Sequence, residues 1–205
     1  MFKGVIFDLD GVICFTDEYH YLAWKALADK EGIEFNREIN NRLRGVSRMD
    51  SLEIILEKAT KAYTDEEKAA MAEDKNNLYR EYLKEMTTAD LSDEVKSTLE
   101  ALHKLGLKLS IGSSSKNTPT ILNQIGLGNF FDAVSDGNNI TKSKPDPEVF
   151  LKAAEFLGLA PSDCLVVEDA LSGAEAGHAG GFKVACVGDA AAAGAGYYNM
   201  NTFAD

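Results

Sequence analysis

Short apolar runs alternate with longer polar stretches along this chain, and each run ends at a polar or acidic residue. The first run, Gly4–Phe7, is wholly apolar, which is typical of a strand buried on both faces of a parallel sheet. Later runs predict strands at Lys108–Gly112, Ala133–Ser135, Cys164–Val167 and Lys183–Val187. Because a helical stretch precedes each later strand, the pattern predicts an α/β fold with a doubly wound parallel sheet.

A long helical stretch separates the first predicted strand from the second. It begins with a helix capped by Thr16 or Asp17 that ends near Gly32, and Thr64 with Glu67 forms a capping-box pattern further on. About seventy residues without a strand far exceed an ordinary crossover. We therefore expect an all-helical cap domain at residues 16–87, inserted into a core formed by residues 1–15 and 88–205. Its later helices are predicted at Arg37–Leu43, Asp50–Ala59 and Asp65–Met86.

Composition narrows the class of protein. The chain has 205 residues, 45% of them hydrophobic, enough to bury a real core. Its formal net charge of −12 argues against a surface for nucleic acids or anionic membranes. Any phosphate site must then rely on a metal ion, local cations and oriented backbone N–H groups.

Neither a membrane span nor a secretory leader is evident. No apolar run reaches the length of a transmembrane helix, and only four residues separate Lys3 from Asp8. Cys14, Cys164 and Cys186 are widely separated and match no metal-binding spacing. We therefore expect reduced thiols and a cytoplasmic protein.

Two carboxylates directly follow the first predicted strand. Alternation along an extended chain places Asp8 and Asp10 on the same side, and Gly11 allows the backbone to turn away. At ~4 Å and an effective dielectric near 20 they would repel by about 4 kcal/mol, so a cation is expected between them. Oxygen ligands of this kind favour Mg²⁺. For a lone Asp-x-Asp motif, the alternative is an exposed turn that caps the next helix.

Other polar residues follow the later strands in a fixed order. Ser113 follows the second predicted strand, Lys144 precedes a proline, and Glu168 and Asp169 follow a buried apolar run. With the Asp-x-Asp-Gly-Val motif, this order resembles the haloacid dehalogenase superfamily of aspartate-nucleophile phosphotransferases, up to about Val187. In doubly wound sheets, ligands bind at the carboxyl ends of strands, where these side chains fall.

These residues could transfer a phosphoryl group. Asp8 would attack phosphorus and become an aspartyl phosphate, while Asp10 would protonate the leaving sugar oxygen and later accept a proton. Ser113 and Lys144 would hold the transferring group by a hydrogen bond and by charge. The superfamily resemblance implies the same roles, with Mg²⁺ held by Asp8, the backbone carbonyl of Asp10, Glu168 and Asp169.

Segments of both the helical insertion and the core resemble one family within that superfamily, the β-phosphoglucomutases. This resemblance implies interconversion of β-glucose 1-phosphate and glucose 6-phosphate. It also implies that β-glucose 1,6-bisphosphate serves as intermediate and priming phosphate donor. The similar segments are Glu18–His20, Ala23–Leu27, Gly45–Arg48, Asp50–Leu52, Lys75–Asn76 and Ser113–Asn117.

A bisphosphate intermediate requires a second phosphate site away from Asp8. Arg48, in the loop after Gly45, is our candidate because a guanidinium can bind a phosphate with two hydrogen bonds. A solvated surface arginine is the alternative. The resemblance adds Gly45, Val46 and Ser47 from the cap and Ser115, Lys116 and Asn117 from the core.

The resemblance assigns His20 and Lys75 to cap closure and to orienting Asp10 and the sugar. Trp24 lies at i+4 from His20, where it could line the sugar pocket or pack inside the cap. Cys14-Phe15 stands where the family leads us to expect a polar Thr-Asp pair near the hinge. Because a phosphoenzyme that meets water is a phosphatase, this departure bears on the balance between hydrolysis and transfer.

Three functions therefore compete. A β-phosphoglucomutase is the leading hypothesis, a capped Mg²⁺-dependent sugar-phosphate phosphatase is the second, and a non-catalytic interaction protein is the third. The third would be expected to lack the nucleophile or the metal-binding acids, and this chain has them. We expect Mg²⁺ and sugar phosphates as ligands, no nucleic-acid or membrane partner, and a monomer. The Ala-rich end past Gly188 is expected to lie away from the site, and Ala190–Gly196 is assigned no function.

Overall fold

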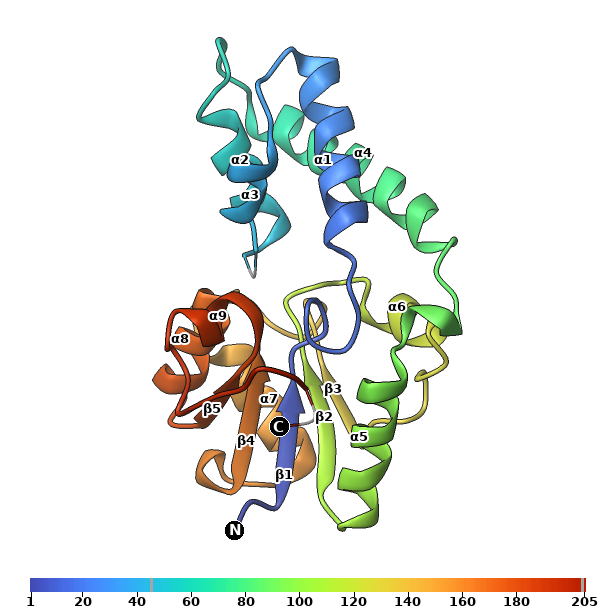
Figure 1. The fold of residues 1–205 in the computed structure, drawn as a ribbon. Helices are drawn as coiled ribbons and strands as arrows, with labels where there is room; N and C mark the ends of the chain where they lie inside the picture. Colours follow the sequence, from blue (N-terminus) through green and yellow to red (C-terminus); the bar gives the residue numbers. More distant parts are fainter. Residues whose placement is uncertain (45, 204) are drawn as a thin grey trace.

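The parallel sheet is present as predicted. The computed structural model describes residues 1–44, 46–203 and 205, and within these ranges it contains one six-stranded sheet in the order β3-β2-β1-β4-β5-β6, with every neighbouring pair parallel. Strand β1 (Gly4–Phe7) lies inside the sheet, and the helical insertion stands beyond the carboxyl ends of the strands (Figure 1). The other strands are β2 (Lys108–Gly112), β3 (Ala133–Ser135), β4 (Cys164–Glu168), β5 (Lys183–Cys186) and β6 (Tyr198–Asn199).

Helices cover both faces of the sheet, because side chains alternate along each strand. From β1, Val5 and Phe7 pack with residues of α5 and α6, whereas Ile6 packs with residues of α7 and α8. Each cluster is apolar and fully or nearly buried, so the sheet is held on both sides and its strand ends are rigid. The core helices are α5 (Asp93–Lys104), α6 (Thr118–Gln124), α7 (Glu148–Leu157), α8 (Leu171–Ala179) and α9 (Gly188–Ala192), with 3₁₀ turns at Thr88–Asp90 and Pro161–Asp163.

The helical cap consists of α1 (Asp17–Glu31), α2 (Arg37–Asn41), α3 (Arg48–Leu56) and α4 (Asp65–Leu83). It has an apolar cluster of its own, which includes Trp24, Leu52 and Ile55. The lower part of α4 packs differently, since Tyr79 and Leu83 belong to the core cluster. The cap is therefore a small helical bundle joined to the core through α4 and the start of α1.

The elements differ locally from the predicted ones, and the start of α3 and the extra strand have clear physical causes. Helix α3 begins at Arg48, two residues early, because the Ser47 hydroxyl accepts a hydrogen bond from the backbone N–H of Asp50 at 3.1 Å. Helix α2 ends at Asn41 rather than residue 43. The helix predicted at residues 65–86 ends at Leu83. The sixth strand, β6, was not predicted, because two exposed residues carry no apolar pattern.

Two observations bear on the expected class of protein. Among the described residues, no helix has the length and apolar character needed to cross a membrane. Cys14, Cys164 and Cys186 are buried free thiols. Burial raises the pKa of Cys164 and of Cys186 to about 11, so both are protonated at neutral pH.

Candidate active site

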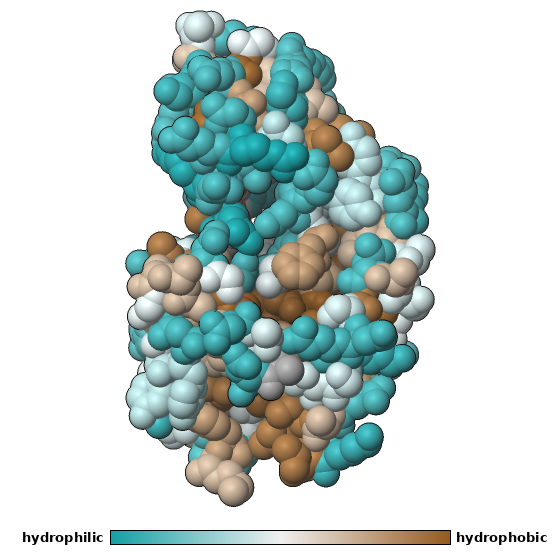
Figure 2. Space-filling model, in the orientation of Figure 1, coloured by the Kyte–Doolittle hydropathy of each residue, from teal (hydrophilic) through white to brown (hydrophobic). Residues whose placement is uncertain are grey.

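A cavity of about 500 Å³ lies between the cap and the carboxyl ends of the strands. Figure 2 shows this face hollowed between the two parts, with hydrophilic residues on the cap side of the hollow and both hydrophilic and apolar residues on the core side. All the predicted site residues that the structure describes line this cavity, and Gly45 lies outside the described residues. The lining includes Asp8, Asp10, His20, Trp24, Val46, Ser47, Arg48, Lys75, Ser113, Ser115, Lys116, Asn117, Lys144, Glu168 and Asp169.

Three acids meet at the sheet edge. Oxygen atoms of Asp8, Glu168 and Asp169 lie within 4.8 Å of one another, because β1 and β4 are adjacent and pair Phe7 with Val167. Gly11 allows the close approach: its φ is 88°, and a Cβ there would collide with the Asp169 carboxylate. The donors are all carboxylate oxygens, the set that Mg²⁺ prefers. The residues therefore fit the metal ion that the sequence predicted.

Lys144 lies inside this acid group. Its Nζ is 2.5 Å from Asp8 Oδ1 and 2.5 Å from Glu168 Oε1, and its side chain is 1% exposed. Burial opposes the charge, but Asp8 and Glu168 hold the pKa of Lys144 above its ordinary value. Glu168 also accepts backbone hydrogen bonds from Asp169 at 2.8 Å and Ala170 at 2.9 Å. The ammonium is thus fixed beside the candidate nucleophile before any ligand binds.

The carboxylate of Asp10 is turned away from the acid group, which corrects the expectation that it crowds Asp8. Strand β1 ends at Phe7, so strand alternation does not extend to Asp10. Its Oδ1 accepts the backbone N–H of Thr16 at 2.8 Å, and its Oδ2 accepts the Thr16 hydroxyl. Burial and the charge of Asp17 raise the pKa of Asp10 to about 7. Asp10 can therefore hold a proton at neutral pH.

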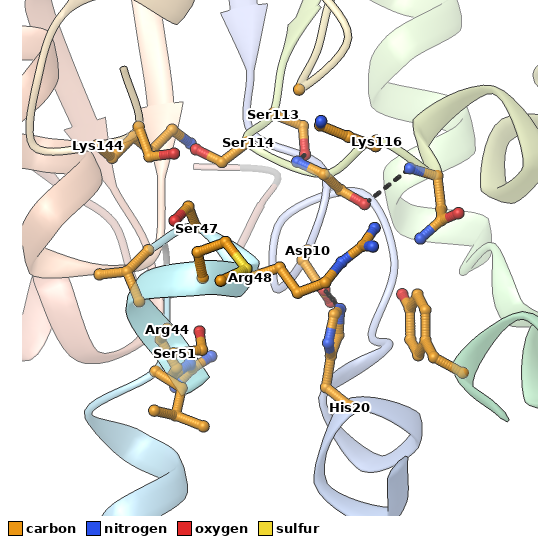
Figure 3. A pocket seen from close by; sticks show the side chains of 18 of the residues that line it. Asp10, His20, Arg44, Ser47, Arg48, Ser51, Ser113, Ser114, Lys116 and Lys144 are labelled. Atoms are coloured by element: carbon orange, nitrogen blue, oxygen red, sulfur yellow. Dashed lines mark hydrogen bonds and ion pairs between the residues drawn. The ribbon is translucent and has the colours of Figure 1, made fainter. Parts of the chain in front are cut away.

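Two side chains of helix α4, Lys75 and Tyr79, connect to Asp10 through His20 and Thr16. Lys75 Nζ lies 2.9 Å from His20 Nδ1, and His20 Nε2 lies 3.6 Å from Asp10 Oδ2. One turn along α4, the Tyr79 hydroxyl donates to the Thr16 hydroxyl at 3.0 Å. Burial, with the positive charges of Lys75 and Arg48, lowers the pKa of His20 well below its usual value, so its ring is neutral at pH 7. His20 projects from α1 toward Asp10 in Figure 3.

On the core side, the loop after β2 is organised by its own hydroxyl groups. The Ser113 hydroxyl accepts the backbone N–H of Ser115 at 3.2 Å, and the Ser115 hydroxyl accepts that of Asn117 at 3.2 Å. The Asn117 side chain also donates to Asn76 of the cap at 3.0 Å. Lys116 is exposed and lines the cavity. Cap and core are in contact through this loop.

Arg48 is the first residue of α3 rather than part of the preceding loop, and its side chain extends across the cavity (Figure 3). Its Nη1 lies 3.3 Å from Glu73 Oε2, and its side chain is 26% exposed. The sequence left open whether Trp24 lines the sugar pocket or packs inside the cap. It does both, because it is 2% exposed within the cap cluster and also lines the cavity. The ammonium of Lys75 lies 4.7 Å from the centre of its ring.

Sequence reasoning missed three residues that contact the predicted ones, and a fourth that pairs with one of these three. Thr16 was expected only as a helix cap, yet its hydroxyl is bound to Asp10 and makes no cap hydrogen bond. Tyr79 at i+4 from Lys75 was a detectable signal on α4. Arg44 pairs with the Asp169 carboxylate of the acid group, and Asp189 pairs with Arg44; these residues are far apart in the sequence, and no local pattern could reveal the contacts.

Comparison with known proteins agrees with this geometry. Residues 2–181 match the model of the haloacid dehalogenase-like hydrolases. The chain belongs to this family. A protein of Bacillus subtilis named β-phosphoglucomutase is 42% identical over 188 residues, which cover 91% of this chain and 83% of that protein. A phosphatase of phosphorylated carbohydrates from Thermotoga maritima is 29% identical over 88% of this chain and 82% of its own length.

Solved structures of the family place the whole chain in the same architecture. The β-phosphoglucomutase of Clostridium difficile superimposes with a TM-score of 0.94 at 36% identity, covering 100% of this chain and 92% of that one. The fold predicted from sequence, a doubly wound parallel sheet with an inserted helical cap, is confirmed. Family members that transfer phosphoryl groups use Mg²⁺, and the acid group described above is the site where this chain could bind it.

Proposed function

We propose that this protein is a β-phosphoglucomutase, which interconverts β-glucose 1-phosphate and glucose 6-phosphate. One observation carries the proposal: a single cavity has an acidic end with a buried lysine and a cationic end lined by Arg48 and Lys116. A bisphosphate needs both ends at once, one for the transferring phosphoryl group and one for the other phosphate. The B. subtilis relative of that name supports the choice of sugar.

Asp8 is the proposed nucleophile. A carboxylate oxygen of Asp8 attacks phosphorus, a P–O bond to Asp8 forms, and the bond from phosphorus to the sugar oxygen breaks. Lys144 neutralises charge at this point, since its ammonium already lies 2.5 Å from Asp8. Ser113, buried at the carboxyl end of β2, supplies a hydrogen bond to the same phosphoryl group.

Asp10 is the proposed general acid and base. Its raised pKa of about 7 allows it to carry the proton that the leaving sugar oxygen takes. In the next half-reaction the same carboxylate removes a proton from the attacking sugar hydroxyl. Thr16 holds Asp10 through two hydrogen bonds, so engagement with the sugar requires that these bonds be exchanged.

We also propose which groups hold the metal ion. Asp8, Glu168 and Asp169 would supply carboxylate oxygens, and Asp10 would supply its backbone carbonyl. When bound, Mg²⁺ would neutralise the charge that the transferring phosphoryl oxygens bring to this acidic edge. The protein's own contribution is to hold these oxygens within 4.8 Å of one another on the ends of rigid strands.

The second phosphate would bind at the cap. Arg48 presents a guanidinium fork, and helix α3 begins there, so its unpaired N–H groups and dipole favour an anion. From the core side, Ser115, Lys116 and Asn117 complete the proposed site, with Val46 and Ser47 contributing from the cap and Gly45 by family resemblance. Glu73 is 58% exposed, so a phosphate can displace it from Arg48.

Cap closure is the proposed source of discrimination against water. Lys75 and His20 connect α4 to Asp10, so movement of the cap moves the general acid as well. We place the cap at residues 16–87 and the core at residues 1–15 and 88–205. The same proposal includes a priming role for β-glucose 1,6-bisphosphate, a monomeric state and a cytoplasmic location. The free thiols of Cys14, Cys164 and Cys186 are consistent with that location.

Product analysis tests the mutase proposal. The enzyme is supplied with β-glucose 1-phosphate, Mg²⁺ and a trace of β-glucose 1,6-bisphosphate, and glucose 6-phosphate and inorganic phosphate are followed together. We expect glucose 6-phosphate to form far faster than inorganic phosphate. Equal rates would instead identify a sugar-phosphate phosphatase, and α-glucose 1-phosphate serves as the control for anomer selectivity.

One observation favours keeping the phosphatase as second candidate. At the hinge, Cys14 is buried and Phe15 is 70% exposed, so this pair offers no polar side-chain contact to the closed cap there. Thr16 supplies the polar contact instead, through Asp10. The T. maritima relative, named as a phosphatase, shows that the family includes this activity.

A further inference from the structure

Arg44 crosses from the cap to the core between helices α2 and α3. Its Nη2 lies 2.6 Å from Asp169 Oδ2 and 3.0 Å from Asp17 Oδ2, and its Nη1 lies 2.9 Å from Asp189 Oδ2. The Ser172 hydroxyl donates to the Arg44 carbonyl at 3.3 Å. Both the side chain and the backbone of this cap residue are therefore held by the core.

The end of the chain past Gly188 forms part of this contact, contrary to the expectation that it lies away from the site. Asp189 lies in the first turn of helix α9, and the backbone N–H of Ala190 donates to the carbonyl of Asp169 at 2.9 Å. Helix α9 is thereby fixed directly beside the acid group, and Asp189 can reach the guanidinium. The Ala-rich segment therefore takes part in the contact through Asp189, the charged residue that directly precedes it.

We propose that Arg44, which follows α2, is a latch that holds the cap on Asp169 and Asp189 of the core, and that it competes with the divalent metal for Asp169. The inference rests on the metal site of the proposed function. It adds a residue that couples occupancy of that site to the position of the cap.

Charge and geometry both support competition. The Arg44 guanidinium is bound at Oδ2 of a carboxylate whose side chain is only 6% exposed, so little water screens the pair. A divalent cation at Asp169 would face this positive charge at close range. Asp189, at 76% exposure, is screened by water and serves to align the guanidinium.

Linkage makes the effect reciprocal. If the latch weakens metal binding, then metal binding must weaken the latch by the same factor. The metal-free protein would keep Arg44 on the core, and the metal-loaded protein would release it. The start of helix α3 with Arg48, four residues further along the chain, is then free to receive a phosphate.

Metal titration of the full chain tests the competition without any turnover. Free Mn²⁺ is followed by electron paramagnetic resonance, in the absence of sugar phosphate, for the wild type, Arg44→Gln and Arg42→Gln. Arg42→Gln is the matched control, because it removes one positive charge two residues away from Arg44. Arg42 itself pairs with Glu57, at 2.7 and 2.8 Å, on the cap surface. We expect Arg44→Gln to bind Mn²⁺ about tenfold more tightly and Arg42→Gln to match the wild type.

Unchanged or weaker Mn²⁺ binding by Arg44→Gln would overturn the latch while leaving the metal site intact, as would equal tightening by Arg42→Gln. Absence of Mn²⁺ binding by the wild type would overturn both the latch and the proposed metal site. A second readout follows the arginine Nε signals by nuclear magnetic resonance, with Arg44 identified by its loss in Arg44→Gln. We expect Arg44 to be ordered without metal and mobile at saturating Mg²⁺, and an Arg44 that stays ordered would contradict the inference.

Discussion

The two ends of the cavity are built in different ways. At the sheet edge, Lys144 and Glu168 are each 1% exposed, and the Lys144 ammonium is already paired with both Glu168 and Asp8. At the cap, Arg48 is 26% exposed and is paired with Glu73, whose side chain is 58% exposed. One end is complete before ligand arrives, whereas the other has cations whose partners are easily exchanged.

This difference assigns separate tasks to the two ends. Rigid strands and buried ion pairs favour a fixed geometry for bond making and breaking at Asp8. Long side chains on a movable cap favour capture and release of a phosphate, which must happen twice in each mutase cycle. Chemistry is therefore expected to depend on the core residues, and binding and closure on the cap residues.

Loss of Lys144 should have the largest effect. Lys144→Met leaves Asp8 and Glu168 buried without their counter-ion, so turnover should fall by about 10³-fold and the fold should lose about 3–5 kcal/mol. Turnover and thermal unfolding measure these effects. Lys142→Met is the control, because Lys142 is 72% exposed and its ion pair with Asp146 lies at the surface. A Lys144→Met enzyme with more than a tenth of wild-type turnover would contradict a preassembled core site.

Arg48→Ala should affect binding more than chemistry. The KM for β-glucose 1-phosphate should rise by about 10²-fold, since a charge-assisted contact contributes roughly 1.5–3 kcal/mol. Transfer from a small acyl phosphate, which has no second phosphate, should be nearly unchanged. Arg42→Ala removes the same charge from an exposed position, so it should change neither the KM for β-glucose 1-phosphate nor the rate of transfer from the acyl phosphate. Equal losses with both donors would place Arg48 in the chemical step instead.

Mg²⁺ should stabilise the fold more at high pH than at low pH. Burial and the charges of Asp8 and Glu168 raise the pKa of Asp169 to about 8, well above the unfolded value of 3.8. The metal-free fold is therefore favoured by protonation: this stabilisation is complete below pH 3.8 and is lost as the pH rises through about 8.

Calorimetry of the protein with Mg²⁺ or with a chelator checks this dependence. The increase in Tm caused by Mg²⁺ should be several degrees larger at pH about 8.5 than at pH about 6, because the ligands must be deprotonated to bind the ion. An increase of equal size at both pH values would show that Asp169 is not a ligand.

Ionic strength should have the smallest effect and should separate the two ends again. Salt screens exposed charges more than buried ones, so raising it to about 0.5 M should increase the KM for the sugar phosphate two- to threefold. Transfer from a small acyl phosphate at Asp8 should change little. Equal sensitivity of both reactions would mean that the core end is as open to solvent as the cap end.

The sequence predicted the core end better than the cap end, for a physical reason. Asp8 and Ser113 directly follow strands, Glu168 is the last residue of one, and parallel strands bring their carboxyl ends together in any such sheet. The turn of Asp10 toward Thr16 depends on how the loop after Phe7 folds, which strand alternation does not describe. The contact from Arg44 to Asp189 joins residues 145 positions apart, and nothing near either residue signals it.

The central claim is that Asp8 becomes transiently phosphorylated while the cap closes over it. Rapid acid quench of the enzyme during turnover, followed by digestion and peptide mapping, tests this directly. We predict an acyl phosphate on Asp8, within the peptide that contains strand β1, and its absence from Asp8→Asn, which should also be inactive. A wild-type peptide that stays unmodified while product forms, or an Asp8→Asn enzyme that retains turnover, would contradict the account.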